Sequence, residues 1–177
     1  MIKKAIAITA MLIGLGFMLI PYDALLLYKN KRNFTISPEP QGSHVTNKSS
    51  LHPIFVIQKH KATHLHYDFR IEKEGVLKSW AIPKEPPQEE GVRRLAVQVK
   101  DHDLGYENFE GTILEGVYGA GVVEIWDKGY YLPVKFQVDE IILDLKGRKL
   151  EGIYCLIKLK PKLSKDKNWL FFKKKSG

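Results

Sequence analysis

The residues between His60 and Ile71 alternate polar and apolar side chains, and they gather histidines, a carboxylate and an arginine on one set of positions. Successive side chains of a β-strand point to opposite faces. The apolar set would line a core: Leu65, Tyr67, Phe69 and Ile71. The polar set would share the other face: His64, His66, Asp68 and Arg70. Such a strand puts metal ligands beside a guanidinium that binds anions.

The ligand types on this polar face indicate its chemistry. Neutral imidazoles and a carboxylate, without any thiolate, suit Mn²⁺, Fe²⁺, Co²⁺ or Zn²⁺, and three such ligands leave coordination positions for water and substrate. Arg70 would hold a phosphate beside the metal through its guanidinium fork. The spacing does not decide which two histidines bind the metal. A hydrogen-bonded polar surface without a metal would show the same pattern.

Two neighbouring runs add polar residues to the same side. In the preceding run, from Phe55, Gln58 and His60 are expected to point outward. In the run from Leu95 the apolar residues are expected to face the core, which leaves His102 on the polar side. We therefore expect a groove on the outside of a β-sheet. Its expected lining residues are His60, His66, Asp68, Arg70 and His102.

The elements that must position these residues are short strands. Runs with strand character are 55–59, 64–71, 76–82, 95–100, 121–126, 134–138, 141–145, 152–159 and 169–172. Helical character is confined to 24–31 and to two weaker segments, 87–93 and 103–109. Short strands at intervals of ~8–12 residues favour a β-sandwich or a β-barrel. The expected fold class is mainly β.

Composition narrows the class of partner. The formal net charge is +8, and the segment from 158 to 175 carries eight lysines against a single acid, Asp166. A basic end of this kind fits a polyanionic partner as well as it fits a solvated lysine face. The only cysteine, Cys155, excludes an intrachain disulfide and a cysteine-rich zinc site.

The N-terminus carries an apolar run, 5–20, directly after Lys3 and Lys4. It is shorter than the ~20 residues that a membrane-spanning helix needs, and no signal-peptidase site follows it. An uncleaved membrane anchor and an extra hydrophobic helix both fit. The expected organisation is a hydrophobic segment over 1–22, a helix and irregular arm over 23–53, and a β-domain over 54–177.

Several motifs together resemble one family, the 3′-phosphoesterase domain of bacterial DNA ligase D and its stand-alone archaeal and bacterial relatives. They occupy 55–60, 65–70, 77–84, 94–97, 101–102, 115–121 and 126–127. Residues 31–34 and 37–40 resemble the opening segment of the family. The resemblance implies a compact β-barrel with a few short helices and an active site in a groove on its outer surface.

The resemblance also implies an activity. Members of the family are Mn²⁺-dependent enzymes that trim DNA 3′ ends, removing a terminal ribonucleoside and then the remaining 3′-phosphate; other divalent transition metals are alternatives. The implied partners are DNA 3′ ends at a primer-template or a break. They extend to end-joining proteins and a separate DNA ligase, because this chain has no Lys-x-Asp-Gly adenylation motif. The implied location is the cytoplasm, or a membrane surface if 5–20 inserts.

Roles carry over residue by residue. The metal ligands would be His60, His66 and Asp68, which leaves out His64. The residues that engage the phosphate would be Arg70 and His102, and further catalytic positions are Lys84, Arg94 and Tyr106. Supporting substrate-binding positions are Arg32, Glu39 and Gln58. Two departures from the family, Asn33 in place of an aspartate and Lys100 in place of an acid, imply weakened removal of the ribonucleoside.

Two other functions fit the same sequence. The first is a DNA-end-binding module without catalysis, in which the basic C-terminal segment contacts phosphates and the histidines hold a structural metal. The second is a membrane-anchored metallophosphodiesterase that acts on a phosphoester other than DNA. Turnover with Mn²⁺ separates the enzyme from the module, and membrane fractionation tests the anchor.

Overall fold

The computed structural model describes residues 26, 28–32, 34–35, 37–40, 51–161, 163 and 166–175. The apolar run 5–20, the segment 1–22 that contains it, and Asn33 lie outside the described residues. Within the described part of the chain, no helix is both long enough and apolar enough to cross a membrane.

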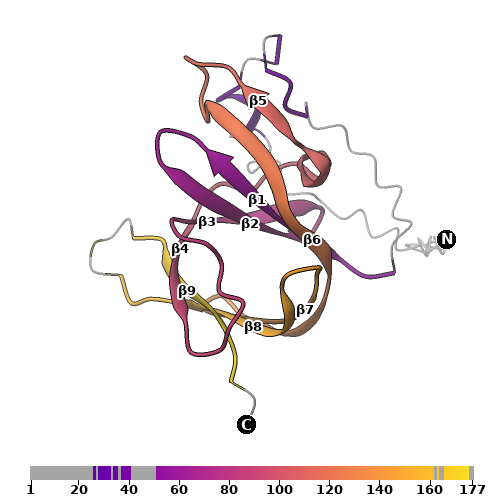
Figure 1. The fold of residues 1–177 in the computed structure, drawn as a ribbon, viewed down its shortest axis with the longest axis vertical. Coiled ribbons are helices and arrows are strands. Elements are labelled where there is room, and N and C mark those ends of the chain that lie inside the picture. The colour runs from indigo at the N-terminus through magenta and orange to yellow at the C-terminus, as the bar shows by residue number, and fades with distance from the viewer. Residues whose placement is uncertain are drawn as a thin grey trace, which may run out of the picture.

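The described chain folds into a closed antiparallel β-barrel (Figure 1). Its strands are β1 (Ile54–Lys61), β2 (Leu65–Lys73), β3 (Val76–Ile82), β4 (Arg93–Gln98), β6 (Gly121–Phe136), β7 (Glu140–Lys146), β8 (Glu151–Lys158) and β9 (Asn168–Lys173). They are ordered β1-β2-β3-β4-β9-β8-β7-β6, and β6 pairs with β1 to close the ring. A short strand, β5 (Gly111–Ile113), pairs with β6 outside the ring. The expected β-barrel is confirmed.

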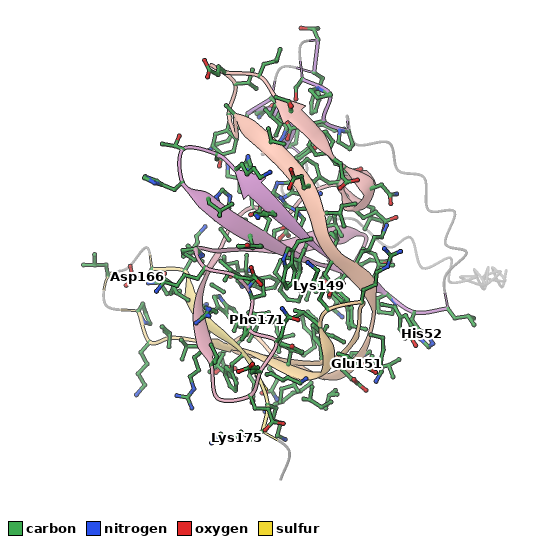
Figure 2. All side chains as sticks on the ribbon, in the orientation of Figure 1. His52, Lys149, Glu151, Asp166, Phe171 and Lys175 are labelled. Atoms are coloured by element: carbon green, nitrogen blue, oxygen red, sulfur yellow. The ribbon has the colours of Figure 1, made fainter. Side chains whose placement is uncertain are left out.

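One apolar cluster fills the inside of the barrel. It draws on all eight strands of the ring, and Phe171, labelled in Figure 2, lies at its centre with its ring 4.8 Å from that of Phe69. The inward parity expected for β2 is confirmed for Tyr67, Phe69 and Ile71, which are all buried. Leu65 was expected in the core but is about half exposed, because it is the first residue of β2.

A two-residue turn sets the register between β2 and β3. Glu74 and Gly75 both have positive φ, 54° and 78°, as a type I′ hairpin turn requires. This turn pairs Lys73 with Val76, and the ladder then places Arg70 opposite Ser79. The polar face of β2 therefore meets a small, hydroxyl-bearing residue on β3.

Three expectations about elements were wrong. In β4 the parity is reversed: Ala96 lies in the core and Leu95 is exposed. The runs 121–126 and 134–138 form one long strand, β6, because Pro133 is accommodated at a register shift in its pairing with β7. Residues 87–93 form no helix.

The expected helical segment around 103–109 is a short 3₁₀ helix, η1 (Leu104–Asn108). The side chain of Asp103 caps it by accepting a hydrogen bond of 2.8 Å from the backbone N–H of Gly105. The cap matters for the site because η1 carries Tyr106, which is buried.

A buried carboxylate fixes the β7–β8 turn. Asp127, on β6, accepts backbone hydrogen bonds from Arg148, Lys149 and Leu150 at 2.9–3.2 Å. A Cβ at Gly147 would lie 2.5 Å from Asp127 Oδ2, so the turn needs glycine there. Asp127 is therefore a structural residue of the barrel wall.

A second apolar cluster lies outside the barrel. Its buried members are Tyr28, Leu77, Tyr106, Phe109, Ile113 and Val123. They join three covering segments, namely the N-terminal arm of described residues 28–40, η1 and β5, to the outer face of the barrel wall. Figure 1 shows the indigo arm beside β5, at the end of the molecule opposite the C-terminus. The site lies between this cover and the wall.

Candidate metal centre and phosphate pocket

The cover and the outer face of β1 to β3 enclose a cavity of about 300 Å³. It brings together side chains from the arm, β1, β2, the segment after β4, and η1. Its lining includes eight of the candidate site residues: Arg32, Glu39, His60, His66, Asp68, Arg70, His102 and Tyr106. The expected position of the groove, on the outer surface of the barrel, agrees with this cavity.

Three potential cation ligands meet at the cavity floor. His60, His66 and Asp68 each offer one ligand atom, and these atoms lie within 4.8 Å of one another. Strand pairing produces this meeting, because His60 is opposite His66 in the β1–β2 ladder and Asp68 lies two residues further along the same face. The side chain of His64 is exposed and does not belong to the group.

The donor set fits a divalent cation. His66 Nδ1 lies 2.9 Å from the carbonyl oxygen of His64, which turns Nε2 toward Asp68 Oδ2 at 3.8 Å. His60 Nδ1 is also 3.8 Å from Asp68 Oδ2. Bonds of about 2 Å from one cation would span such separations. His60 Nε2 is buried and has no hydrogen-bond partner among the described residues.

Asp68 is held as a carboxylate. Burial opposes its ionisation, but the guanidinium of Arg70 and the nearby His60, His66 and His102 together lower its pKa below the usual range. Arg70 Nη2 donates to Asp68 Oδ2 at 3.0 Å. An ionised carboxylate between two imidazoles is a ligand set ready for a cation.

Gln58 holds Arg70 and the cover at the same time. Its Oε1 accepts a 2.7 Å hydrogen bond from Arg70 Nε, and its Nε2 donates to the backbone carbonyls of Tyr106 and Phe109 at 3.0 and 2.9 Å. Gln58 is completely buried. It therefore supports the site from below and does not contact the cavity.

His102 lies between two guanidiniums. Its Nδ1 is 2.9 Å from Arg70 Nη1 and 2.9 Å from the carbonyl oxygen of Lys100, and its Nε2 is 3.3 Å from Arg32 Nη2. Burial, together with the positive charges of Arg70 and Arg32, lowers the pKa of His102 well below its ordinary value. The ring is therefore neutral at pH 7.

The N-terminal arm reaches the site through Glu39. This buried carboxylate accepts hydrogen bonds from Arg32 Nε at 2.7 Å, Tyr106 Oη at 3.0 Å and Ser37 Oγ at 2.9 Å. Burial raises the pKa of Tyr106, so its phenol stays neutral and donates. The guanidinium of Arg32 also lies 3.9 Å from the ring centroid of Tyr28. Arg32 is thus fixed by the arm and turned toward His102.

Besides Gln58, two other candidate residues do not line the cavity. Lys84 is exposed beyond the end of β3, and Arg94, on β4, donates from Nε to the backbone carbonyl of Glu85 at 2.9 Å. Both lie outside the cavity that contains His66 and Asp68. Their assignment to catalysis remains a prediction.

Three neighbours of the site were missed by the sequence reasoning. Ser79 Oγ accepts a 3.0 Å hydrogen bond from Arg70 Nη1, and its outward parity on β3 was the signal that could have found it. Tyr118 lines the cavity although its side chain is exposed, and the ammonium of Lys31 lies 4.7 Å from its ring centroid. No pattern in the sequence links Lys31 to Tyr118.

Comparison with known proteins identifies the family. Residues 58–158 match the family described as the DNA Ligase D 3′-phosphoesterase domain. The chain belongs to this family. The match covers more than half of the chain and contains the cation-ligand group, Arg70 and His102. The family resemblance expected from the motifs is thereby confirmed.

Curated relatives of this phosphoesterase-family chain are multifunctional non-homologous end joining proteins named LigD. Identity is 43% over 155 residues with the protein of Pseudomonas aeruginosa, covering 85% of this chain and 18% of the relative. It is 42% over 159 residues with that of Mycolicibacterium smegmatis, covering 84% and 20%. It is 44% over 142 residues with that of Mycobacterium bovis, covering 77% and 18%. The chain spans about a fifth of the length of these relatives.

Proposed function

We propose that this chain is a metal-dependent phosphoesterase that heals DNA 3′ ends, removing a terminal ribonucleoside and then the 3′-phosphate. One observation carries the proposal. The three cation ligands open into the same cavity as two guanidiniums, those of Arg32 and Arg70. Membership of the DNA ligase D phosphoesterase family supports the same chemistry.

The cation would be held by His60, His66 and Asp68, and Mn²⁺ fits their mixed nitrogen and oxygen donors. A bound divalent cation withdraws electron density from a phosphoryl group and makes water a better nucleophile at neutral pH. The residues of the chain supply binding and orientation. Arg32 places its positively charged guanidinium at the cavity wall, and Arg70 holds Asp68 and His102 in fixed positions.

The environment of His102 restricts its role. A neutral imidazole between two arginines can exchange hydrogen bonds with a phosphate oxygen, but it carries no extra proton for the leaving oxygen at pH 7. We infer that His102 orients the phosphate and that the leaving oxygen takes its proton from water.

The proposed setting is DNA break repair, because the curated relatives are named for non-homologous end joining. The partners would be DNA 3′ ends, with a ligase and end-joining proteins acting on the healed product. Lys100, with Asn33, is expected to weaken ribonucleoside removal relative to 3′-phosphate removal.

The decisive test uses a labelled primer-template that ends in one ribonucleotide, incubated with and without Mn²⁺. We expect first a 3′-phosphate product and then a 3′-hydroxyl product, both absent after chelation. A second substrate that carries only a 3′-phosphate measures the monoesterase step alone. Salt-sensitive DNA binding without turnover of either substrate would instead support the non-catalytic end-binding module.

A further inference from the structure

Two lysines that the proposed catalytic set does not use line the cavity, and a third lies near them. Lys31 comes from the arm, Lys100 follows β4, and Lys167 precedes β9. Lys31 and Lys100 line the same cavity as the cation ligands. Lys167 is tied to β4, because its carbonyl oxygen accepts a 2.8 Å hydrogen bond from the backbone N–H of Gln98. Three separate parts of the chain thus bring ammonium groups together.

The two lysines that line the cavity lack the carboxylate partners that neighbouring cationic side chains have. Partial desolvation and the nearby Lys31, Lys167 and Arg32 lower the pKa of Lys100. In the part of the chain that the structure describes, neither Lys31 nor Lys100 forms an ion pair with a carboxylate. Lys78, by contrast, lies 2.6 Å from Asp101. The carboxylates that line the cavity, Glu39 and Asp68, are paired with Arg32 and Arg70. The lysine charges therefore create a local positive potential that attracts anions.

The rest of the basic C-terminal run lies elsewhere. Lys173, Lys174 and Lys175 line a different hollow together with Glu90 and Glu151. Figure 2 shows Lys175 at the end of the molecule opposite the arm, whereas Asp166, which precedes Lys167, projects from the connection between β8 and β9. The lysine run recognised in the sequence therefore splits: Lys167 lies near Lys100, whereas Lys173 to Lys175 line another hollow.

We propose that Lys31 and Lys100 bind the phosphate immediately before the one that is hydrolysed, and that the strand leaves the cavity past Lys167. This inference rests on the proposed function. The two lysines and the cation ligands share one cavity of about 300 Å³, which is too small for two strands. Two phosphates bound together in this cavity would therefore be successive phosphates of one strand. An ammonium is a point charge suited to such a backbone contact.

The experiment compares a short oligonucleotide that ends in a 3′-phosphate with a nucleoside 3′-monophosphate, which lacks the preceding linkage. For Lys100→Ala we expect the ratio of the two kcat/KM values to fall about fivefold to tenfold, mainly through KM of the oligonucleotide. The salt dependence of oligonucleotide binding should weaken by about one unit of slope. Lys146→Ala removes an equal charge from β7, far from the cavity, and should leave the ratio unchanged.

A neutral methylphosphonate identifies the phosphate. It is placed at the linkage before the terminal nucleoside of the oligonucleotide. For the wild type, it should lower the ratio of kcat/KM values by the same factor as the Lys100→Ala substitution does. For Lys100→Ala, it should lower that ratio no further. An equal loss on both substrates, or sensitivity to a methylphosphonate only on a template strand, would overturn the assignment. If the wild type hydrolyses neither 3′-phosphate, the proposed function fails instead, so the two failures are distinguishable.

Discussion

Arg70 Nη1 lies 2.9 Å from Nδ1 of His102. The two residues come from separate parts of the chain, because Arg70 lies on β2 and His102 follows β4. The same guanidinium donates to Gln58, Ser79 and Asp68. Of its five N–H groups, these contacts leave one Nη2 N–H to meet a substrate. Arg70 therefore acts mainly as a buried hub that positions the ligand carboxylate and the phosphate-facing imidazole.

We expect Arg70→Lys to damage both stability and activity although it keeps the charge. Lysine cannot reproduce a fork that contacts four side chains, so Asp68 and His102 lose their common support. The free energy of unfolding should fall by about 3 kcal/mol, measured by urea denaturation. Arg93→Lys is the matched control, because Arg93 is exposed and lies over the ring of Phe172. Equal stabilities of the two variants would refute the hub.

The two nearby histidines should differ sharply in their importance for turnover. His66→Ala removes a proposed ligand and should abolish 3′-phosphate release with Mn²⁺, yet leave the fold intact, because its side chain is about a quarter exposed. His64→Ala keeps the backbone carbonyl that His66 contacts and should retain activity. Circular dichroism checks folding in both variants. Mn²⁺-dependent release by His66→Ala would remove it from the ligand set.

Mn²⁺ should stabilise the folded chain in the absence of any DNA. A ligand that binds only the folded state at a hundred times its Kd adds about 2.7 kcal/mol to the free energy of unfolding. We expect a clear rise in the melting temperature with Mn²⁺ that a chelator reverses. The rise should disappear in His66→Ala. An unchanged wild-type melting temperature at saturating Mn²⁺ would contradict a cation site.

His102 should make stability depend on pH below neutrality. Its pKa in the folded state is well below the value of about 6.5 that it has when unfolded. Between these values the unfolded chain binds a proton that the folded chain does not, so stability falls as pH decreases from 7 to 5.5, by at most about 1.4 kcal/mol per pH unit. Asp68, with its lowered pKa, loses its contribution only at more acid pH.

Denaturation of the wild type and His102→Asn across this pH range isolates that contribution. The variant should show a shallower pH dependence, and the difference between the two curves should grow as the pH falls. Parallel curves would mean that His102 is protonated equally well in both states.

Asp127→Ala should separate stability from chemistry. Loss of this carboxylate leaves the N–H groups of Arg148, Lys149 and Leu150 without their acceptor, which should cost about 3 kcal/mol or more. Because Asp127 does not line the cavity, activity per folded molecule should be retained at low temperature. Denaturation and kinetics on the same preparation measure both quantities. A proportionate loss of kcat at full folding would tie Asp127 to catalysis.

The outward face of β2 could be predicted because its alternation is unambiguous. Histidine, aspartate and arginine alternate with aromatic and branched residues, so assigning one residue to a face of the strand assigns all the others. In β4 the same reasoning failed at Leu95 and Ala96, because alanine in a core is indistinguishable from alanine on a surface. His102 nevertheless reaches the site, since the chain leaves β4 after Gln98 and pairs as a bridge with Leu77.

The sequence does not predict which polar side chains of the site hydrogen-bond to one another. The sequence indicates that Arg70 and Asp68 share a face, but not that Gln58 and Ser79 take two of the five guanidinium N–H groups. Such sharing depends on pairing between strands and on the cover, which are not local properties. The single long β6 was missed for a similar reason, because the pairing partner of β6 accommodates Pro133.

The three proposed cation ligands all lie within the β1–β2 hairpin, at His60, His66 and Asp68. During synthesis this hairpin leaves the ribosome before His102, Tyr106 and the β6 strand that closes the barrel. A nascent chain therefore holds a complete ligand set before it has a closed barrel. A cation captured at that stage would clamp the two strands together and favour the correct hairpin while the remaining strands are still being made.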